Sequence, residues 1–139
     1  EHHGVGDKFM ILGVASPWSE RKGLGDFVRL ADELDPNRFA IVLVGLSKRQ
    51  LKVLPENIIG LERTSSAEEL AGIYSAADVF FNPTREDNYP TVNLEAEACG
   101  TPVVTYDVGG CRETICCSNS LAISKTSDSF LKLVTSIAS

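Results

Sequence analysis

The feature that most constrains the fold is a regular alternation of short apolar runs with longer stretches whose apolar residues recur at helical spacing. The apolar runs cover residues 9–14, 39–44, 57–61, 78–82 and 102–106, and a further short strand is expected near Leu121. Strands that are apolar on both faces need cover on both faces, which is typical of parallel sheets flanked by helices. The sequence therefore predicts an α/β fold with a doubly wound, Rossmann-like parallel sheet.

The stretches between these runs predict the helices. Apolar residues at helical spacing indicate helices over residues 24–34, 48–54 and 91–99. Another helix is expected to begin at Ser66, because this N-cap candidate is followed three residues later by Glu69. A brief helical turn is expected after Gly109-Gly110, before the short strand near Leu121, and a final amphipathic helix is expected from Ser127.

The size and charge of the chain narrow the classes of function. The 139 residues can bury a core without disulfides or metals, and we expect residues 7–139 to form one domain after a tag or linker remnant at 1–6. The net charge of −6 gives no basic surface for nucleic acid. No run approaches the roughly 20 apolar residues of a membrane helix, and no signal-peptide pattern is present. The four cysteines lack the paired spacing of a zinc site, so we interpret them as reduced thiols of a cytoplasmic protein.

The loop after the first predicted strand carries a cation next to a helix start. In sheets of this class, ligands bind outside the carboxyl ends of the strands. Lys22 stands there at the positive end of the following helix, where a cation is unfavourable unless an anion such as a phosphate binds beside it. Judged from this loop alone, a solvated surface lysine is a better interpretation of Lys22 than a phosphate-binding one. Arg21 is interpreted as solvated or paired with Glu20.

The loop after the fourth predicted strand leads into a helix with an unusual carboxylate. Pro90 suits the first turn of that helix. At roughly 100° per residue, Glu95 falls in the middle of a broad apolar arc, with Asn93 and Glu97 opposite. An inward carboxylate needs a partner, and its two oxygens suit the vicinal hydroxyls of a ribose. A buried ion pair is an equally good explanation, with these candidate partners: Arg63, Arg85 and Arg112.

Several motifs in order resemble the C-terminal domain of family 4 glycosyltransferases. Residues 85–104 match, as do Gly109-Gly110 after them, Arg-Lys-Gly at 21–23 and Ala-Ala-Asp at 76–78. The family motif is an acidic residue, seven residues and a glutamate, and Asp87 and Glu95 have this spacing. The resemblance implies two Rossmann-like domains around a donor cleft, and retaining transfer of a hexose from a nucleotide diphosphate sugar.

The resemblance also implies a role for each matching position. Glu95 would hold the ribose hydroxyls, Asp87 would contact the transferred sugar, and Lys22 would neutralise the departing diphosphate without a metal or another cofactor. The backbone N–H groups of Thr91 and Val92 would meet the diphosphate at the helix N-terminus. The base would rest against the loop after Leu61, and the remaining donor contacts would come from the following residues: Glu62, Arg63, Thr64, Asn88 and Tyr89.

Three departures from the family pattern accompany the match. An arginine that the family often places before the lysine is replaced by Ala15 or Ser16, and Asp87 stands where glutamate is usual. The N-terminal domain, which supplies acceptor contacts, is missing, so the fragment is expected to bind donor weakly and to transfer little or nothing by itself. The expected partner is a saccharide or lipid-linked acceptor in polysaccharide biosynthesis. Any peripheral attachment to a membrane is expected to come from the missing part.

Two other functions fit the same residues: half of a nucleotide-sugar epimerase, and a non-catalytic nucleotide-sugar-binding module. A dehydrogenase is disfavoured because no G-x-G-x-x-G follows the first predicted strand. Glycoside hydrolysis is disfavoured because the two carboxylates flank a helix start that suits a phosphate.

Overall fold

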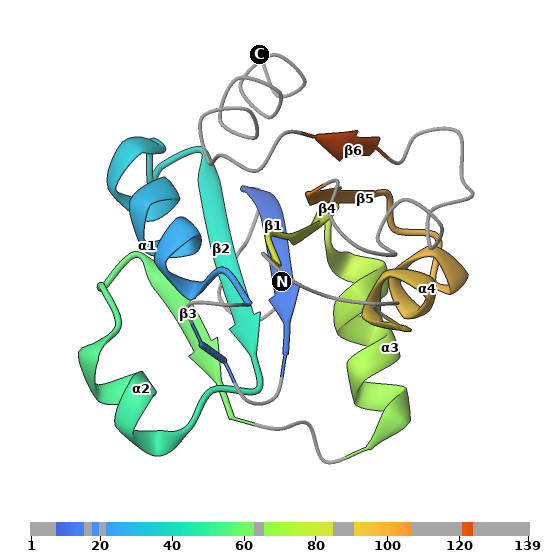
Figure 1. Ribbon diagram of the computed structural model, residues 1–139, viewed down its shortest axis with the longest axis horizontal. Helices are drawn as coiled ribbons and strands as arrows, with labels where there is room; N and C mark the ends of the chain where they lie inside the picture. The colour runs from blue at the N-terminus through green and yellow to red at the C-terminus, as the bar shows by residue number, and fades with distance from the viewer. Residues whose placement is uncertain are drawn as a thin grey trace.

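Six parallel strands form one sheet at the centre of the molecule (Figure 1). The computed structural model describes residues 8–15, 18–19, 22–62, 66–84, 91–106 and 121–123. The strand order is β3-β2-β1-β4-β5-β6. The bounds of the strands are β1 Phe9–Val14, β2 Phe39–Val44, β3 Ile58–Leu61, β4 Val79–Asn82, β5 Val103–Tyr106 and β6 Leu121–Ile123. The predicted doubly wound parallel sheet is confirmed.

The helices cover both faces of this sheet, as the doubly apolar strands require (Figure 1). Their bounds are α1 Leu24–Glu33, α2 Lys48–Val53, α3 Ala67–Ala76 and α4 Thr91–Ala98. Helices α1 and α2 pack on one face and α3 and α4 on the other. Successive residues of β1 divide accordingly, because Ile11 packs in the α1 layer while Met10 and Leu12 pack in the α3 layer.

Local signals explain where the helices begin. Ser66 caps α3 as predicted, since its side chain accepts a hydrogen bond from the Glu69 backbone N–H at 3.0 Å. Ser47 and Gln50 form a capping box at α2, which the sequence reasoning did not single out. The turn after Gly109-Gly110 and the helix from Ser127 lie outside the described residues.

The two central strands place two loops side by side at the carboxyl edge of the sheet. The strand order reverses between β1 and β4, and such switch points are where ligands bind in open α/β sheets. Gly23 precedes α1 with φ of +91°. A Cβ atom added there would lie 2.5 Å from Cγ of Pro83, the first residue after β4, and closer still to its carbonyl oxygen. Only glycine therefore fits where the β1 loop crosses the β4 loop.

None of the helices in the described ranges combines the length and apolar character needed to cross a bilayer.

Candidate functional site

Lys22 lies in a turn that is tied to the carboxyl edge of the sheet. Its backbone N–H donates to the Ser19 carbonyl at 3.1 Å, and its side chain is half-buried. The preceding Trp18 is buried, and its indole N–H donates to the Val44 carbonyl at the end of β2 at 2.9 Å. The ring of Trp18 also meets Phe27 of α1 edge-on, with 5.5 Å between centroids. The predicted phosphate-binding lysine thus stands on an anchored loop at the predicted edge.

A buried carboxylate fixes the start of α1. Asp26 is fully buried in the first turn of α1, and its two oxygens accept from the Tyr106 hydroxyl at the end of β5 and from Arg29 at 2.8 Å. A carboxylate is favoured at this end of a helix, and the two donors satisfy it. The sequence reasoning missed Asp26, although an aspartate in the first turn of an apolar helix pattern is a usable signal.

Helix α4 is rotated from its predicted orientation. Asn93, predicted to face outward, is fully buried and accepts a hydrogen bond from the buried Asn82 side chain at 3.0 Å. Ala96 is also fully buried, whereas Glu95 and Ala98 are exposed. The inward position predicted for Glu95 is therefore wrong. Hydropathy alone could not predict the hydrogen bond between the two asparagines in the interface between the sheet and α4. Glu97 is half-buried rather than fully solvated.

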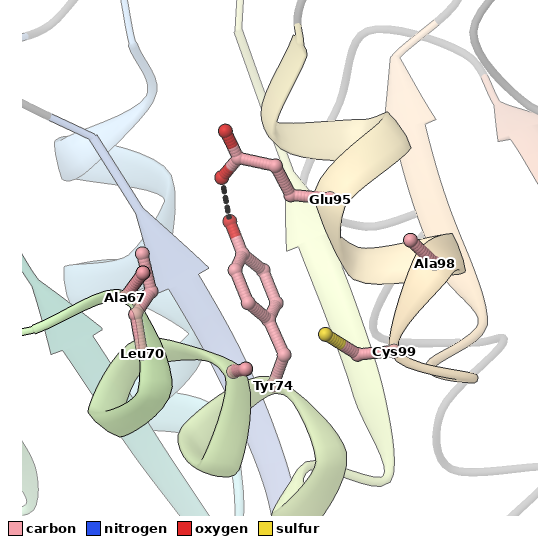
Figure 2. A pocket seen from close by; sticks show the side chains of 7 residues that line it. Ala67, Leu70, Tyr74, Glu95, Ala98 and Cys99 are labelled. Carbon is pink, nitrogen blue, oxygen red and sulfur yellow. Dashed lines mark hydrogen bonds between the residues drawn. The ribbon is translucent and has the colours of Figure 1, made fainter.

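The exposed Glu95 instead stands on the rim of a pocket between α3 and α4 (Figure 2). The pocket has a volume of about 380 Å³ and a largely apolar wall. Its lining residues are Ala67, Leu70, Ala71, Tyr74, Glu95, Ala98 and Cys99. A carboxylate above an apolar slot suits a ligand with hydroxyl groups next to a flat, weakly polar ring.

One hydrogen bond joins the two helices across this pocket. The Tyr74 hydroxyl donates to Oε1 of Glu95 at 3.0 Å (Figure 2). Burial raises the pKa of Tyr74 well above its usual range, and the neighbouring Glu95 charge and this hydrogen bond raise it further. Tyr74 is therefore a protonated donor throughout the neutral range, and nothing in the sequence alone singles it out.

The structure places part of the predicted donor site. Lys22 lies before α1 and Thr91 begins α4, both at the carboxyl edge, while Val92 is half-buried in the first turn of α4. Several predicted residues lie outside the described residues, namely Arg21, Arg63, Thr64, Arg85, Asp87, Asn88, Tyr89 and Arg112. Glu62 is described and is exposed just after β3. No cluster of three or more potential metal ligands occurs within the ranges that the structure describes.

Comparison with known proteins identifies the family of this chain. A family model described as glycosyl transferases group 1 matches residues 8–138. The D-inositol 3-phosphate glycosyltransferase of Corynebacterium jeikeium is 31% identical over 124 residues, which cover 77% of this chain and 29% of that protein. The alpha-galactosylglucosyldiacylglycerol synthase of Streptococcus pneumoniae is 31% identical over 116 residues, which cover 76% of this chain and 30% of that protein.

A solved structure shares the fold. The Anabaena protein HepE, solved in complex with UDP-glucose, matches with a TM-score of 0.76 and 21% identity. The match covers 96% of this chain and 40% of HepE. This chain thus spans less than half the length of each of these three proteins.

Proposed function

Since the chain belongs to the group 1 glycosyl transferases, we propose that it is the donor-binding domain of an enzyme that transfers a hexose from a nucleotide diphosphate sugar. The observation that carries the proposal is the Glu95 carboxylate on the rim of the α3–α4 pocket. It stands on a helix whose N-terminus lies at the carboxyl edge of the sheet.

Glu95 holds the vicinal hydroxyls of the ribose in this proposal. One oxygen of Glu95 accepts from Tyr74, and a carboxylate has further lone pairs for two ligand hydroxyls. The base then enters the apolar slot beside Leu70 and reaches toward the loop after Leu61, where Glu62, Arg63 and Thr64 follow. HepE, which shares the fold, was solved in complex with UDP-glucose, and this supports a nucleotide sugar as the ligand of the present chain.

The diphosphate occupies the space between two helix starts. The N-terminus of α4, with the backbone N–H groups of Thr91 and Val92, lies at the carboxyl edge of the sheet, and Lys22 belongs to the β1 loop at the same edge. When the bond between the anomeric carbon and the phosphate oxygen breaks, the departing diphosphate gains negative charge. Lys22 and these N–H groups stabilise that charge, so the step needs no metal ion.

In this proposal, residues of the loop before α4 hold the transferred sugar. Asp87, by its spacing from Glu95, contacts hydroxyls of the sugar, and Asn88 and Tyr89 belong to the same donor-binding loop. The acceptor hydroxyl attacks the anomeric carbon on the face from which the diphosphate leaves, and its proton passes to the departing diphosphate oxygen, so the configuration is retained. Ala15 or Ser16 stands at the place of the family arginine, so Lys22 is the cation assigned to the diphosphate, and Arg21 is the candidate substitute for the missing arginine.

The acceptor is bound by a part of the enzyme that this chain does not contain. The relatives it matches are more than twice as long, and their names refer to an inositol phosphate and to a diacylglycerol glycolipid. We infer that a saccharide or lipid-linked acceptor binds to the remaining part. The isolated chain is accordingly expected to bind donor weakly without transferring the sugar.

Replacing Lys22 by alanine tests the role in diphosphate binding. The affinity of the full-length enzyme for a nucleoside diphosphate should fall about tenfold, while its affinity for the corresponding nucleoside stays within twofold. Isothermal titration with both ligands measures the difference. Lys52→Ala, which removes an exposed cation from α2, is the matched control and should change neither affinity. Equal weakening of nucleoside and diphosphate in Lys22→Ala would contradict the assignment.

A further inference from the structure

The hydrogen bond from Tyr74 to Glu95 joins a buried donor to an exposed acceptor. Tyr74 is 1% exposed, and its ring packs against Phe80 of β4 with 5.5 Å between centroids. Its backbone carbonyl also accepts a hydrogen bond from the Thr101 hydroxyl before β5. Glu95, in contrast, is exposed on α4. Packing therefore fixes the phenol, and the phenol restrains the carboxylate through this hydrogen bond.

This arrangement matters for a ligand that needs both carboxylate oxygens at once. Two adjacent ribose hydroxyls must meet an oxygen pair of fixed orientation, and an exposed glutamate would otherwise lose rotamer freedom on binding. With Oε1 held at 3.0 Å from the phenol, the plane of the carboxylate is set before the ligand arrives. The hydroxyl of Tyr74 points from the pocket wall up to Glu95 at the rim (Figure 2).

We propose that Tyr74 is a positioning residue that orients the Glu95 carboxylate for the ribose diol of the donor, and so contributes to selection of ribonucleotides. The inference rests on the proposed role of Glu95 in donor binding. Tyr74 acts through Glu95 and does not itself touch the reacting atoms. Its contribution should depend on the two ribose hydroxyls and should vanish when the ligand lacks them.

The test compares UDP with 2′,3′-dideoxy-UDP on the full-length enzyme by isothermal titration, with GDP or ADP and its dideoxy analogue in place of UDP if that nucleotide binds more tightly. Tyr74→Phe keeps the buried ring and removes only the hydroxyl. We expect it to weaken the ribonucleotide about 3- to 10-fold and to leave the dideoxy analogue within twofold. In transfer assays, the KM for the donor should rise by a similar factor while kcat stays nearly constant.

Two further variants keep the result interpretable. Leu70→Ala changes the wall of the same pocket without touching the hydrogen bond, and it should weaken both nucleotides equally. In a Glu95→Gln background, Tyr74→Phe should have less than half its effect on the ribonucleotide, because the carboxylate that it orients is gone. The cycle of these variants subtracts any effect of Tyr74→Phe, including one on folding, that does not pass through Glu95.

Each outcome bears on one of the two claims. If Tyr74→Phe weakens both nucleotides equally, or neither, the positioning role is wrong while the ribose role of Glu95 stands. If the unaltered enzyme binds the dideoxy analogue as well as the ribonucleotide, and Glu95→Gln changes nothing, then the proposed role of Glu95 is itself wrong and the inference falls with it.

Discussion

Replacing Glu95 by alanine is expected to weaken binding of the nucleotide sugar about 100-fold, because two charge-assisted hydrogen bonds to the ribose are lost. The fold should be retained, since the Glu95 side chain is exposed and alanine is a good helix former. Steady-state kinetics on the full-length enzyme should show the loss as a raised KM for the donor. Thermal unfolding without ligand should show the same cooperative transition at a slightly lower melting temperature, because the buried Tyr74 hydroxyl loses its acceptor.

Glu97 provides a matched control on the same helix. It is half-buried on another side of α4 and does not line the pocket between α3 and α4. Glu97→Gln should leave the donor KM within twofold of the unaltered enzyme. If Glu95→Ala and Glu97→Gln changed the KM to the same degree, the effect would come from the charge of the helix and not from contact with the ribose.

Replacing Gly23 by alanine is expected to lower the free energy of unfolding by about 3 kcal/mol. A side chain is strained at φ of +91°, and the added Cβ would overlap Pro83 at the start of the β4 loop. The chain must shift to relieve this overlap, so the loop that carries Lys22 should move away from the β4 loop. Urea unfolding measures the stability loss, and the affinity for a nucleoside diphosphate should fall in the same variant.

Gly72 is the control for this substitution. It lies in α3 at an exposed position, and an added Cβ would meet no other atom within 4 Å. Gly72→Ala should therefore stabilise the protein by about 0.5–1 kcal/mol, through better helix propensity and a less flexible unfolded chain. A Gly23→Ala protein as stable as the unaltered one would contradict the close crossing of the two loops.

The strands could be predicted almost to the residue because their signal is strong and local. A run such as Phe39–Val44, buried along its whole length, can only lie inside a covered parallel sheet. The predicted strand at 78–82 begins one residue later, because Asp78 uses its carboxylate to accept the Met10 backbone N–H at 2.7 Å. A hydrogen bond between residues so far apart in the sequence has no local signal.

The site was harder to predict because it depends on how helix α4 is turned. Hydropathy put Glu95 toward the core and Asn93 opposite, but Asn93 is the buried residue, because Asn82 supplies its hydrogen-bond partner. Glu95 lies on the rim of the pocket between α3 and α4 and not inside the core. Tyr74 resembled an ordinary apolar residue of an amphipathic helix, and only the structure brings its hydroxyl to Glu95.

The central claim is that this chain forms a nucleotide-sugar site around Glu95, and thermal shift with a panel of nucleotide diphosphate sugars tests it most directly. In the full-length enzyme, one donor at about 100 times its dissociation constant should stabilise the protein by about 2.7 kcal/mol and raise the melting temperature by about 2–4 °C. At the same concentration, this donor should stabilise the 100-fold weaker Glu95→Ala variant by only about 0.4 kcal/mol, which raises its melting temperature by less than about 1 °C. A flat response to every donor, or a shift that Glu95→Ala leaves unchanged, would contradict the account.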